Sequence, residues 1–292
     1  MPSLRDIRTR IRSVKNISQI TRAMQMVAAS RMRRAQESVE SSRPFSEKIR
    51  QVLAGVGDAA PTGEGPLHPL LERREVQNID LILITSDRGL AGGFNANALR
   101  LASNFVLKDA GAPVNLLTLG RKGRDYMVRY GRNVIADFSE LGDAPGLDAV
   151  TPVARTVTER FTAGETDAVY MVYTKYISTL NQTPRIEQLL PIEPPTEEEE
   201  REAQRGPDYI YEPSPVLLLQ ALLPRYVEIR LYQALLESKA SEHSSRMVAM
   251  RNATDAANDI VDDLSLTYNK ARQAAITREI IEIAGGAAAL EG

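Results

Sequence analysis

The glycine-rich segment from Ser86 to Asn95 (SDRGLAGGFN) is the part of this chain best suited to bind a ligand. It follows an apolar run and precedes a helical pattern, and such a turn can bind phosphate through backbone N–H groups. The segment matches neither G-x-G-x-x-G nor G-x-x-x-x-G-K-[ST], and no lysine follows its glycines. We therefore expect a structural turn that lets a helix and a strand pack closely, with nucleotide binding as the alternative.

The remaining chemically active residue types are too few or too scattered for catalysis. Cysteine is absent, which excludes disulfides, thiolate metal sites and thiol catalysis, and fits a reducing compartment. His68 lies in a proline-flanked loop and His243 on a helical stretch that we expect to be exposed, so a zinc site or a Ser-His-Asp arrangement is not expected. Asp262 and Asp263 are adjacent and point in different directions on a helix. We predict no catalytic residues, no cofactor and no metal, in a protein that connects or moves other molecules.

The two ends of the chain carry its longest regular patterns. Ser3 to Arg43 and Arg225 to Ala284 contain neither glycine nor proline, whereas helices average about 11–12 residues. As a helix, the second tract would be roughly 90 Å long. Apolar or small residues recur every three to four positions in both tracts, as in a coiled-coil seam. The first series is Leu4, Ile7, Ile11, Val14, Ile17, Ile20, Met24 and Val27; the second includes Val227, Leu231, Leu235, Val248, Val261 and Leu264, with many Ala and Ser residues between them.

We expect the two tracts to form a long antiparallel two-stranded coiled coil, because an apolar stripe is unstable in water. The alternative is that both helices pack along the central part of the chain, but a domain of about 150 residues offers no face of that length. Ser3 with Asp6 predicts a capped helix start. Pro224 is expected to kink or begin the last helix, and Gly285 and Gly286 to end it.

Between the two tracts the apolar pattern changes to that of strands alternating with helices. The expected strands are 79–85, 114–119, 134–138 and 168–173, with 182–190 as a possible edge strand; the expected helices are 95–107, 122–130 and 152–162. Continuously apolar strands separated by helices predict a parallel α/β sheet covered on both faces. The fold class is therefore α/β, with an N-terminal coiled-coil helix at 1–56, an α/β domain at 57–212 and a C-terminal coiled-coil helix at 213–292.

Charge is distributed unevenly, although the net charge is only −2. In the first fifty residues basic side chains outnumber acidic ones about three to one, which is also typical of mitochondrial transit peptides and nucleic-acid-binding arms. The helical pattern continues past residue 30 without a cleavage-like break, and the basic residues lack aromatic neighbours for base stacking. No apolar run approaches the roughly 18 residues of a membrane span, so we expect membrane association only through a partner.

Four segments resemble the gamma-subunit family of F-type ATP synthases. They are Ile7–Ile11 with Ile20–Ser30, Ser86–Asn95, Arg246–Asp255 and Tyr268–Ile280, and the resemblance extends along the whole chain in order. It implies a long antiparallel coiled coil of the N- and C-terminal helices plus a central Rossmann-like parallel-sheet domain. Ala91 stands where many members carry cysteine, and the regulatory cysteines of chloroplast relatives are missing. The resemblance therefore favours a bacterial type without thiol control, as does a helix that begins at residue 3.

The function that this resemblance implies is that of a central-stalk rotor in a proton-translocating ATP synthase. Such a subunit is essential but not itself catalytic, and couples c-ring rotation to conformational cycling of three alpha and three beta subunits. The implied partners are alpha, beta, epsilon and the c ring, without nucleic acid, at the cytoplasmic side of the inner or plasma membrane. A nucleotide-binding α/β enzyme with oligomerising helices is the alternative, and a coiled-coil adaptor or nucleic-acid binder is a third possibility.

The resemblance also assigns three sets of contact residues. Contacts with alpha and beta are expected at Met24, Arg246, Gln273, Thr277 and Glu279. Contacts with the c ring and epsilon are expected at Tyr211 and Glu212. The apolar end of the last helix, with Ile276, Ile280 and Ile283, would turn as a bearing within an apolar collar, whereas an ordinary buried helix end is the alternative.

Overall fold

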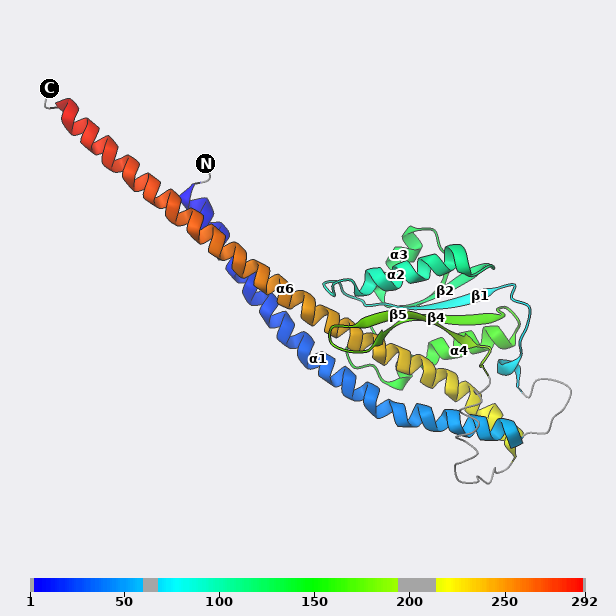
Figure 1. Ribbon diagram of the computed structural model, residues 1–292. Helices are drawn as coiled ribbons and strands as arrows, with labels where there is room; N and C mark the ends of the chain where they lie inside the picture. Colours follow the sequence, from blue (N-terminus) through cyan, green and yellow to red (C-terminus); the bar gives the residue numbers. More distant parts are fainter. Residues whose placement is uncertain (1–2, 60–67, 194–213, 291–292) are drawn as a thin grey trace. The chain divides into compact units, whose positions relative to one another are not determined.

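The computed structural model describes residues 3–59, 68–193 and 214–290, which form two compact units. One unit consists of Met1–Ala28 with Met247–Gly292, and the other of Ala29–Arg246. Helix α1 (Leu4–Ala59) and helix α6 (Pro215–Leu290) each contribute to both units (Figure 1). The domain boundaries expected from the sequence stay a prediction, and Tyr211 and Glu212 lie outside the described residues.

The two helices extend beyond the tracts without glycine and proline, 3–43 and 225–284. The start of α1 is capped as expected: the Asp6 N–H donates to Ser3 Oγ (3.2 Å), and the Ser3 N–H donates to Asp6 Oδ2 (3.2 Å). Helix α6 contains Pro224 in its interior, where buried Leu223 and Val227 on either side supply packing that offsets the missing hydrogen bond. The predicted helix end at Gly285 and Gly286 is wrong, since α6 continues to Leu290. Glycine lowers helix propensity by only about 1 kcal/mol, and the alanines that follow favour the helix.

In the unit made by the two chain ends, α1 and α6 are antiparallel. The inter-helix side-chain hydrogen bonds are Arg8–Tyr268 (2.6 Å), Ser18–Asn258 (2.8 Å) and Thr21–Thr254 (2.7 Å). From the Arg8–Tyr268 pair to the Ser18–Asn258 pair, the residue number rises in α1 and falls by the same amount in α6. The two helices are therefore antiparallel and keep one register between these pairs. The predicted coiled coil of the termini is therefore confirmed for this unit.

The seam of this coiled coil differs in part from the predicted one. Thr21 and Ala28 are buried in α1, whereas Ile17, Ile20 and Val27, which we expected in the seam, are half exposed or more. Small side chains at the seam let two helix backbones approach closely, so the bulkier neighbours lie beside the contact. The prediction for these three residues is wrong because it weighted hydrophobicity above side-chain size.

The unit of residues 29–246 contains a five-stranded sheet in the order β3-β2-β1-β4-β5. Its strands are β1 (Ile79–Ile84), β2 (Val114–Leu119), β3 (Val134–Phe138), β4 (Ala168–Tyr176) and β5 (Gln182–Leu190). The first four are parallel, and β5 pairs antiparallel with β4 as an edge strand. The helical elements are η1 (Pro69–Leu71), α2 (Phe94–Asn104), the π-helix η2 (Phe105–Asp109), α3 (Arg121–Arg129), η3 (Leu147–Ala149) and α4 (Thr151–Thr162). This strand order is that of a Rossmann-like sheet, so the predicted fold class is confirmed.

Both faces of the sheet are covered, as the continuously apolar strands require. Alternate residues of β1 point to opposite faces: Leu81 and Leu83 pack with α2 and α3, whereas Ile82 and Ile84 belong to the core that contains α4 and α6 (Figure 1). Within this unit, α6 is thus part of the α/β core through the buried residues Leu219, Leu223, Tyr226, Val227, Ile229, Leu231, Ala234 and Leu235. The alternative that we set aside, a terminal helix packed on the central domain, therefore holds for this portion of α6.

Helix α1 also contacts α6 inside the same unit. Ala35 and Val39 of α1 form a buried cluster with Leu236 and Ala240 of α6. The α6 segment of this unit therefore joins two structures at once, the sheet on one side and α1 on another.

Candidate functional site

The carboxyl ends of β1 and β4 are the position where an α/β sheet of this topology binds its ligand. Strand β2 lies on one side of β1 and β4 on the other, and ligands of open α/β sheets bind in the crevice at such a switch point. Here α6 lies at that position. Ser238 Oγ accepts a hydrogen bond from the Thr174 N–H of β4 (3.0 Å), and Arg246 donates to the Gly89 carbonyl in the turn after β1 (3.2 Å).

The glycine-rich turn after β1 is held by its own side chains. Asp87 Oδ1 accepts a hydrogen bond from the Arg121 N–H at the start of α3 (3.0 Å), and Asp87 Oδ2 accepts one from the Glu140 N–H (3.1 Å). A helix N-terminus attracts anions, and this one already has a carboxylate of the same chain. Gly120, just before α3, approaches Thr85 so closely that a Cβ atom would lie 2.2 Å from the Thr85 carbonyl oxygen. These contacts are those of the structural turn that we expected.

The α6 segment at this position, residues 237–246, is polar and yet buried; we call it the polar segment. Its buried polar residues are Glu237, Ser238, Lys239, Ser241, Glu242, His243, Ser244 and Arg246. Buried polar groups need partners, and the serines find them in the hairpin of β4 and β5: Ser241 donates to the Thr174 carbonyl (3.1 Å) and Ser244 to the Thr179 carbonyl (2.8 Å).

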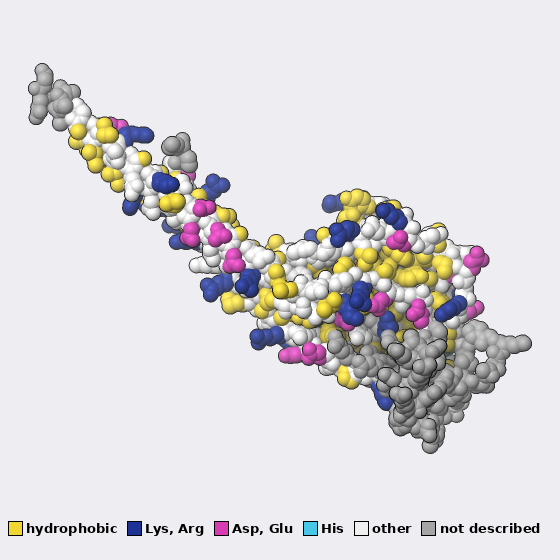
Figure 2. Space-filling view, viewed as in Figure 1, with side chains coloured by type: hydrophobic (Ala, Val, Ile, Leu, Met, Phe, Trp, Pro, Cys, Tyr) yellow, Lys and Arg dark blue, Asp and Glu magenta, His cyan; other side chains and the backbone are white. Residues whose placement is uncertain are grey.

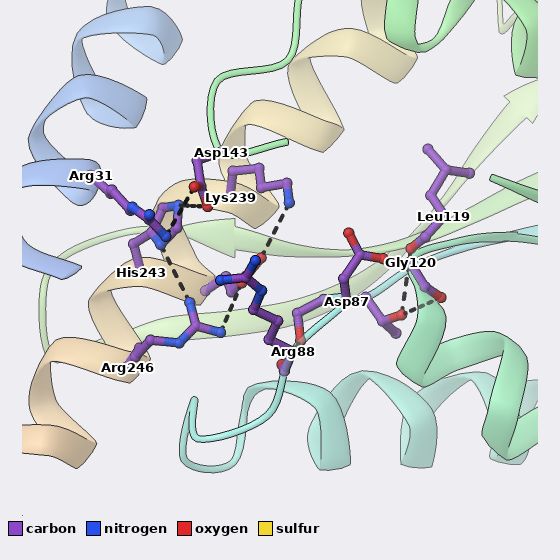
Figure 3. A network of polar contacts seen from close by, with 12 residues as sticks. Arg31, Asp87, Arg88, Leu119, Gly120, Asp143, Lys239, His243 and Arg246 are labelled. Carbon is purple, nitrogen blue, oxygen red and sulfur yellow. Dashed lines mark hydrogen bonds and ion pairs between the residues drawn. The ribbon is translucent and has the colours of Figure 1, made fainter. Parts of the chain in front are cut away.

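The charged residues of the polar segment pair with one another along the helix. Glu242 accepts from Arg246 (2.9 Å) and faces Lys239 Nζ (3.5 Å), and all three side chains are nearly inaccessible to solvent (Figure 3). Glu242 thus pairs with two buried cations, one of which also bonds the turn after β1. The polar segment therefore fixes α6 to the sheet by hydrogen bonds of defined direction.

His243 is fully buried, so the expectation that it is exposed is wrong. Arg246 Nη1 lies 3.4 Å from its Nδ1, and because arginine can only donate, the ring proton belongs on Nε2. Nε2 points towards Asp143 Oδ1 at 3.9 Å, and Asp143 also pairs with Arg31 of α1 (2.9 Å; Figure 3). Burial lowers the pKa of His243, so the ring is neutral at neutral pH. His68 has a local role, because its Nδ1 accepts from the Leu70 N–H at the start of η1.

The lowered pKa of His243 predicts a loss of stability in mild acid. The unfolded chain takes up the proton near the ordinary histidine pKa of 6.5, whereas the folded chain resists it. This contribution is fully present above pH 6.5 and is lost as the pH falls through the lower pKa of the folded state. We expect the urea midpoint of the full chain to fall less between about pH 7.5 and about pH 5.5 in His243→Gln than in the wild type. Equal decreases would show that His243 does not contribute.

The structure distributes the predicted contact residues over different environments. Gln273, Thr277 and Glu279 are exposed on α6, and Met24 is half-buried on α1. Arg246 is instead buried in the polar segment, where it binds Glu242 and Gly89. The contacts of these five residues with other subunits stay predictions.

The apolar residues near the end of α6 are open to solvent. Ile276, Ile280 and Ile283 are 48%, 60% and 67% exposed, and Figure 2 shows yellow apolar side chains along this part of the helix. Their exposure differs from that of a buried helix end, the alternative considered above. Their role as a bearing stays a prediction.

Sequence reasoning missed the residues that join α6 to the rest of its unit. Asp143, Arg31 and Glu242 carry no motif, and Asp87 was noted only as part of a glycine-rich turn. A usable signal was present in residues 237–246 (ESKASEHSSR), where a long apolar stripe gives way to small and charged residues. Such an interruption indicates that this part of the helix is buried against hydrogen-bonding partners and packs closely against its neighbours.

Two kinds of feature are absent from the residues that the structure describes. No helix in these ranges is both apolar and long enough for a membrane span. No group of three or more His, Asp or Glu side chains in residues 3–59, 68–193 and 214–290 is placed to hold a metal ion.

Comparison with known proteins gives full-length matches. A family model described as "ATP synthase" matches residues 3–290. The ATP synthase gamma chain of Roseiflexus castenholzii is 52% identical over 293 residues, covering 99% of each chain, and that of Chloroflexus aurantiacus is 50% identical over 293 residues, again with 99% of each. Among solved structures, a chain of the central stalk and c-ring of the Tetrahymena thermophila mitochondrial ATP synthase aligns with a TM-score of 0.60 and 26% identity. That alignment covers 80% of this chain and 99% of the Tetrahymena chain.

A second solved structure shows similarity of fold. A chain of the Euglena gracilis mitochondrial ATP synthase rotor aligns with a TM-score of 0.61 at 18% identity, over 94% of this chain and 98% of the Euglena chain. The architecture of terminal helices and a central sheet is therefore shared at low sequence identity.

Proposed function

This chain belongs to the ATP synthase gamma chain family, and from this membership we propose that it is the central-stalk rotor that couples c-ring rotation to the catalytic cycle. It is a non-catalytic subunit of the ATP synthase complex. Nucleotide chemistry then belongs to neighbouring subunits, and this chain transmits movement between them.

The continuity of α6 carries this proposal. The helix is part of the α/β core from Leu219 to Leu235, is bonded to β4 and to the turn after β1 by its polar segment, and pairs with α1 near the chain ends. A torque applied to the α/β domain therefore enters α6 through packed side chains and directed hydrogen bonds. Helix α6 itself continues from these residues into the segment that pairs with α1.

We assign the partners by family membership and surface chemistry. They are the alpha and beta subunits as a 3:3 hexamer, the epsilon subunit and a proton-driven c ring, without nucleic acid. Membrane association occurs only through the complex, at the cytoplasmic side of the cell membrane. The exposed isoleucines Ile276, Ile280 and Ile283 support an apolar bearing, because apolar contacts break and reform on rotation without loss of specific hydrogen bonds.

The alternative of a nucleotide-binding enzyme is disfavoured because side chains of this protein already occupy the switch point between β1 and β4. The polar segment of α6 lies at the ends of β1 and β4, and the Asp87 carboxylate binds the start of α3. The isolated chain should therefore not bind a mononucleotide stoichiometrically in calorimetry. Stoichiometric binding would favour the enzyme.

Purification from membranes tests the assignment. The tagged chain, expressed in its own cells, should be recovered from detergent-solubilised membranes together with alpha and beta ATPase subunits in a fixed ratio. If it is recovered without them, the rotor assignment is wrong.

Replacing Met24 with lysine tests the predicted contact with beta. A lysine at this half-buried position would bring an unpaired charge into the predicted contact, so we expect the number of protons pumped per ATP hydrolysed to fall by about tenfold. The yield of assembled complex should change little. Met26→Lys, at a more exposed position two residues away, is the matched control. An unchanged pumping ratio in Met24→Lys would remove Met24 from the contact set.

A further inference from the structure

The loop that follows β3, residues 139–146, contacts more elements than a surface connection requires. The Glu140 N–H donates to Asp87 in the turn after β1, and Tyr232 of α6 donates its hydroxyl to the Pro145 carbonyl (3.3 Å). Glu140 and Gly142 both have positive φ angles (64° and 75°), so the backbone conformation of the loop is specific. The loop is therefore fixed to the sheet and to α6 at separate points.

Asp143 occupies the part of this loop that lies between the two long helices. Its Oδ2 pairs with Arg31 Nη1 of α1 at 2.9 Å, and its Oδ1 lies 3.9 Å from His243 Nε2 of α6. Figure 3 shows Arg31 reaching Asp143 from α1 and His243 reaching it from α6. One carboxylate thus faces a cation on one helix and a ring N–H on the other.

The chemistry of the His243 ring directs that N–H to Asp143. Arg246 occupies Nδ1 as a donor, which leaves Nε2 as the protonated nitrogen. At 3.9 Å the contact is longer than a hydrogen bond, and a movement of the loop of about 1 Å towards α6 would bring it to hydrogen-bonding distance. Nε2 is buried and makes no hydrogen bond at this distance, so a closer Asp143 would supply the partner that bulk water cannot.

We propose that Asp143 is a positioning residue for torque transfer, which holds α1 and α6 to the α/β domain through Arg31 and His243. This inference rests on the proposed rotor function. The Arg31–Asp143 pair resists sliding of α1 past the loop, and the His243 contact resists turning of α6 beneath it.

The exposure of Asp143 separates this role from one in folding. Its side chain is 48% exposed and that of Arg31 is 33% exposed, and ion pairs of this kind contribute little to stability. A complex that carries Asp143→Asn should therefore assemble normally. A mechanical role of Asp143 would then appear as a lower ratio of protons pumped to ATP hydrolysed. Asp125→Asn is a matched control, because Asp125 is 49% exposed and pairs with Arg124 at the same distance of 2.9 Å on α3.

The experiment uses the complete ATP synthase in inverted membrane vesicles and measures ATP-driven proton pumping relative to ATP hydrolysis. We expect Asp143→Asn to lower this ratio about two- to fivefold, as expected for loss of one partly exposed ion pair. Asp143→Glu should keep most of the ratio, and Asp125→Asn should match the wild type. Arg31→Asp should lower the ratio, and the charge exchange R31D/D143R should raise it again.

Two results would overturn the proposal: Asp143→Asn with the ratio of the control, or a charge exchange no better than Arg31→Asp alone. If Asp143→Asn fails to assemble, the comparison of R31D/D143R with Arg31→Asp decides in the same way. As a first step, the wild-type chain is supplied to membranes that lack it, and proton pumping is measured. Failure to restore pumping there refutes the proposed function, whereas the Asp143 proposal fails only when the wild type succeeds.

Discussion

Replacing Glu242 with glutamine should lower the free energy of unfolding by about 3–5 kcal/mol, the usual cost of removing one partner from a buried ion pair. Glu242 is only 7% exposed and faces both Lys239 and Arg246, so the change leaves two buried cations without their carboxylate. Glutamine is nearly the same size, which separates the effect of charge from that of packing. Urea unfolding of the full chain, followed by circular dichroism, measures the change.

Glu159→Gln is the control for this substitution. Glu159 pairs with Arg155 on the surface of α4 with 63% of its side chain exposed, and its loss should cost about 0–1 kcal/mol. A loss of less than about 1 kcal/mol for Glu242→Gln as well would mean that the polar segment is hydrated. It would then not fix α6 to the sheet in the way described.

Replacing Gly120 with alanine should destabilise the chain by about 4 kcal/mol, through backbone strain and overpacking together. Gly120 has a φ of +104°, and an added Cβ would lie 2.2 Å from the Thr85 carbonyl oxygen. Thr85 cannot move away freely, because its N–H donates to the Leu119 carbonyl between β1 and β2 (2.8 Å). The denaturation midpoint of the full chain measures this effect.

Gly111→Ala separates the two causes. Gly111 also has a positive φ, +66°, but an added Cβ there meets nothing within 4 Å. It should cost only the backbone strain, about 1–2 kcal/mol. If both substitutions cost the same, the close approach of α3 to the end of β1 does not matter for stability.

The sheet was predictable because β1, β2 and β4 are mostly apolar and alternate with helical patterns, whereas the largely polar β5 was expected only as an edge strand. The bounds of β2, β3 and β5 agree with the predicted 114–119, 134–138 and 182–190. The apolar strands β1 and β2 end at polar residues or glycine, so the sequence marks their limits. The antiparallel pairing of the chain ends was also predictable, since each end carries an apolar stripe.

The contacts within the polar segment could not be predicted in the same way. A histidine among serines and charged residues is typical of a solvated helix face, yet His243 is buried, with Arg246 of α6 and Asp143 of the 139–146 loop facing its ring. Partners such as Asp143 and Arg31 are distant in sequence and follow no periodic pattern. Hydrophobic periodicity identifies which helices pack, whereas buried polar pairing depends on the assembled fold.

The choice of seam residues shows the same limit on a smaller scale. Ile17 and Ile20 fit the expected spacing, but Thr21 lies in the seam and bonds Thr254 at 2.7 Å. Several spacings of three and four residues fit one apolar sequence. The register that forms depends on the side-chain sizes of both helices, and the sequence of one helix alone does not contain this information.

Direct observation of rotation tests the central claim, that this chain turns as a unit within the complex. The chain has no cysteine, so Lys108→Cys on the exposed surface of η2 provides a single attachment point for a bead. With the beta subunits fixed to a surface and ATP supplied, we predict that the bead turns continuously in one direction. A bead that stays still while the same complexes hydrolyse ATP would contradict the account.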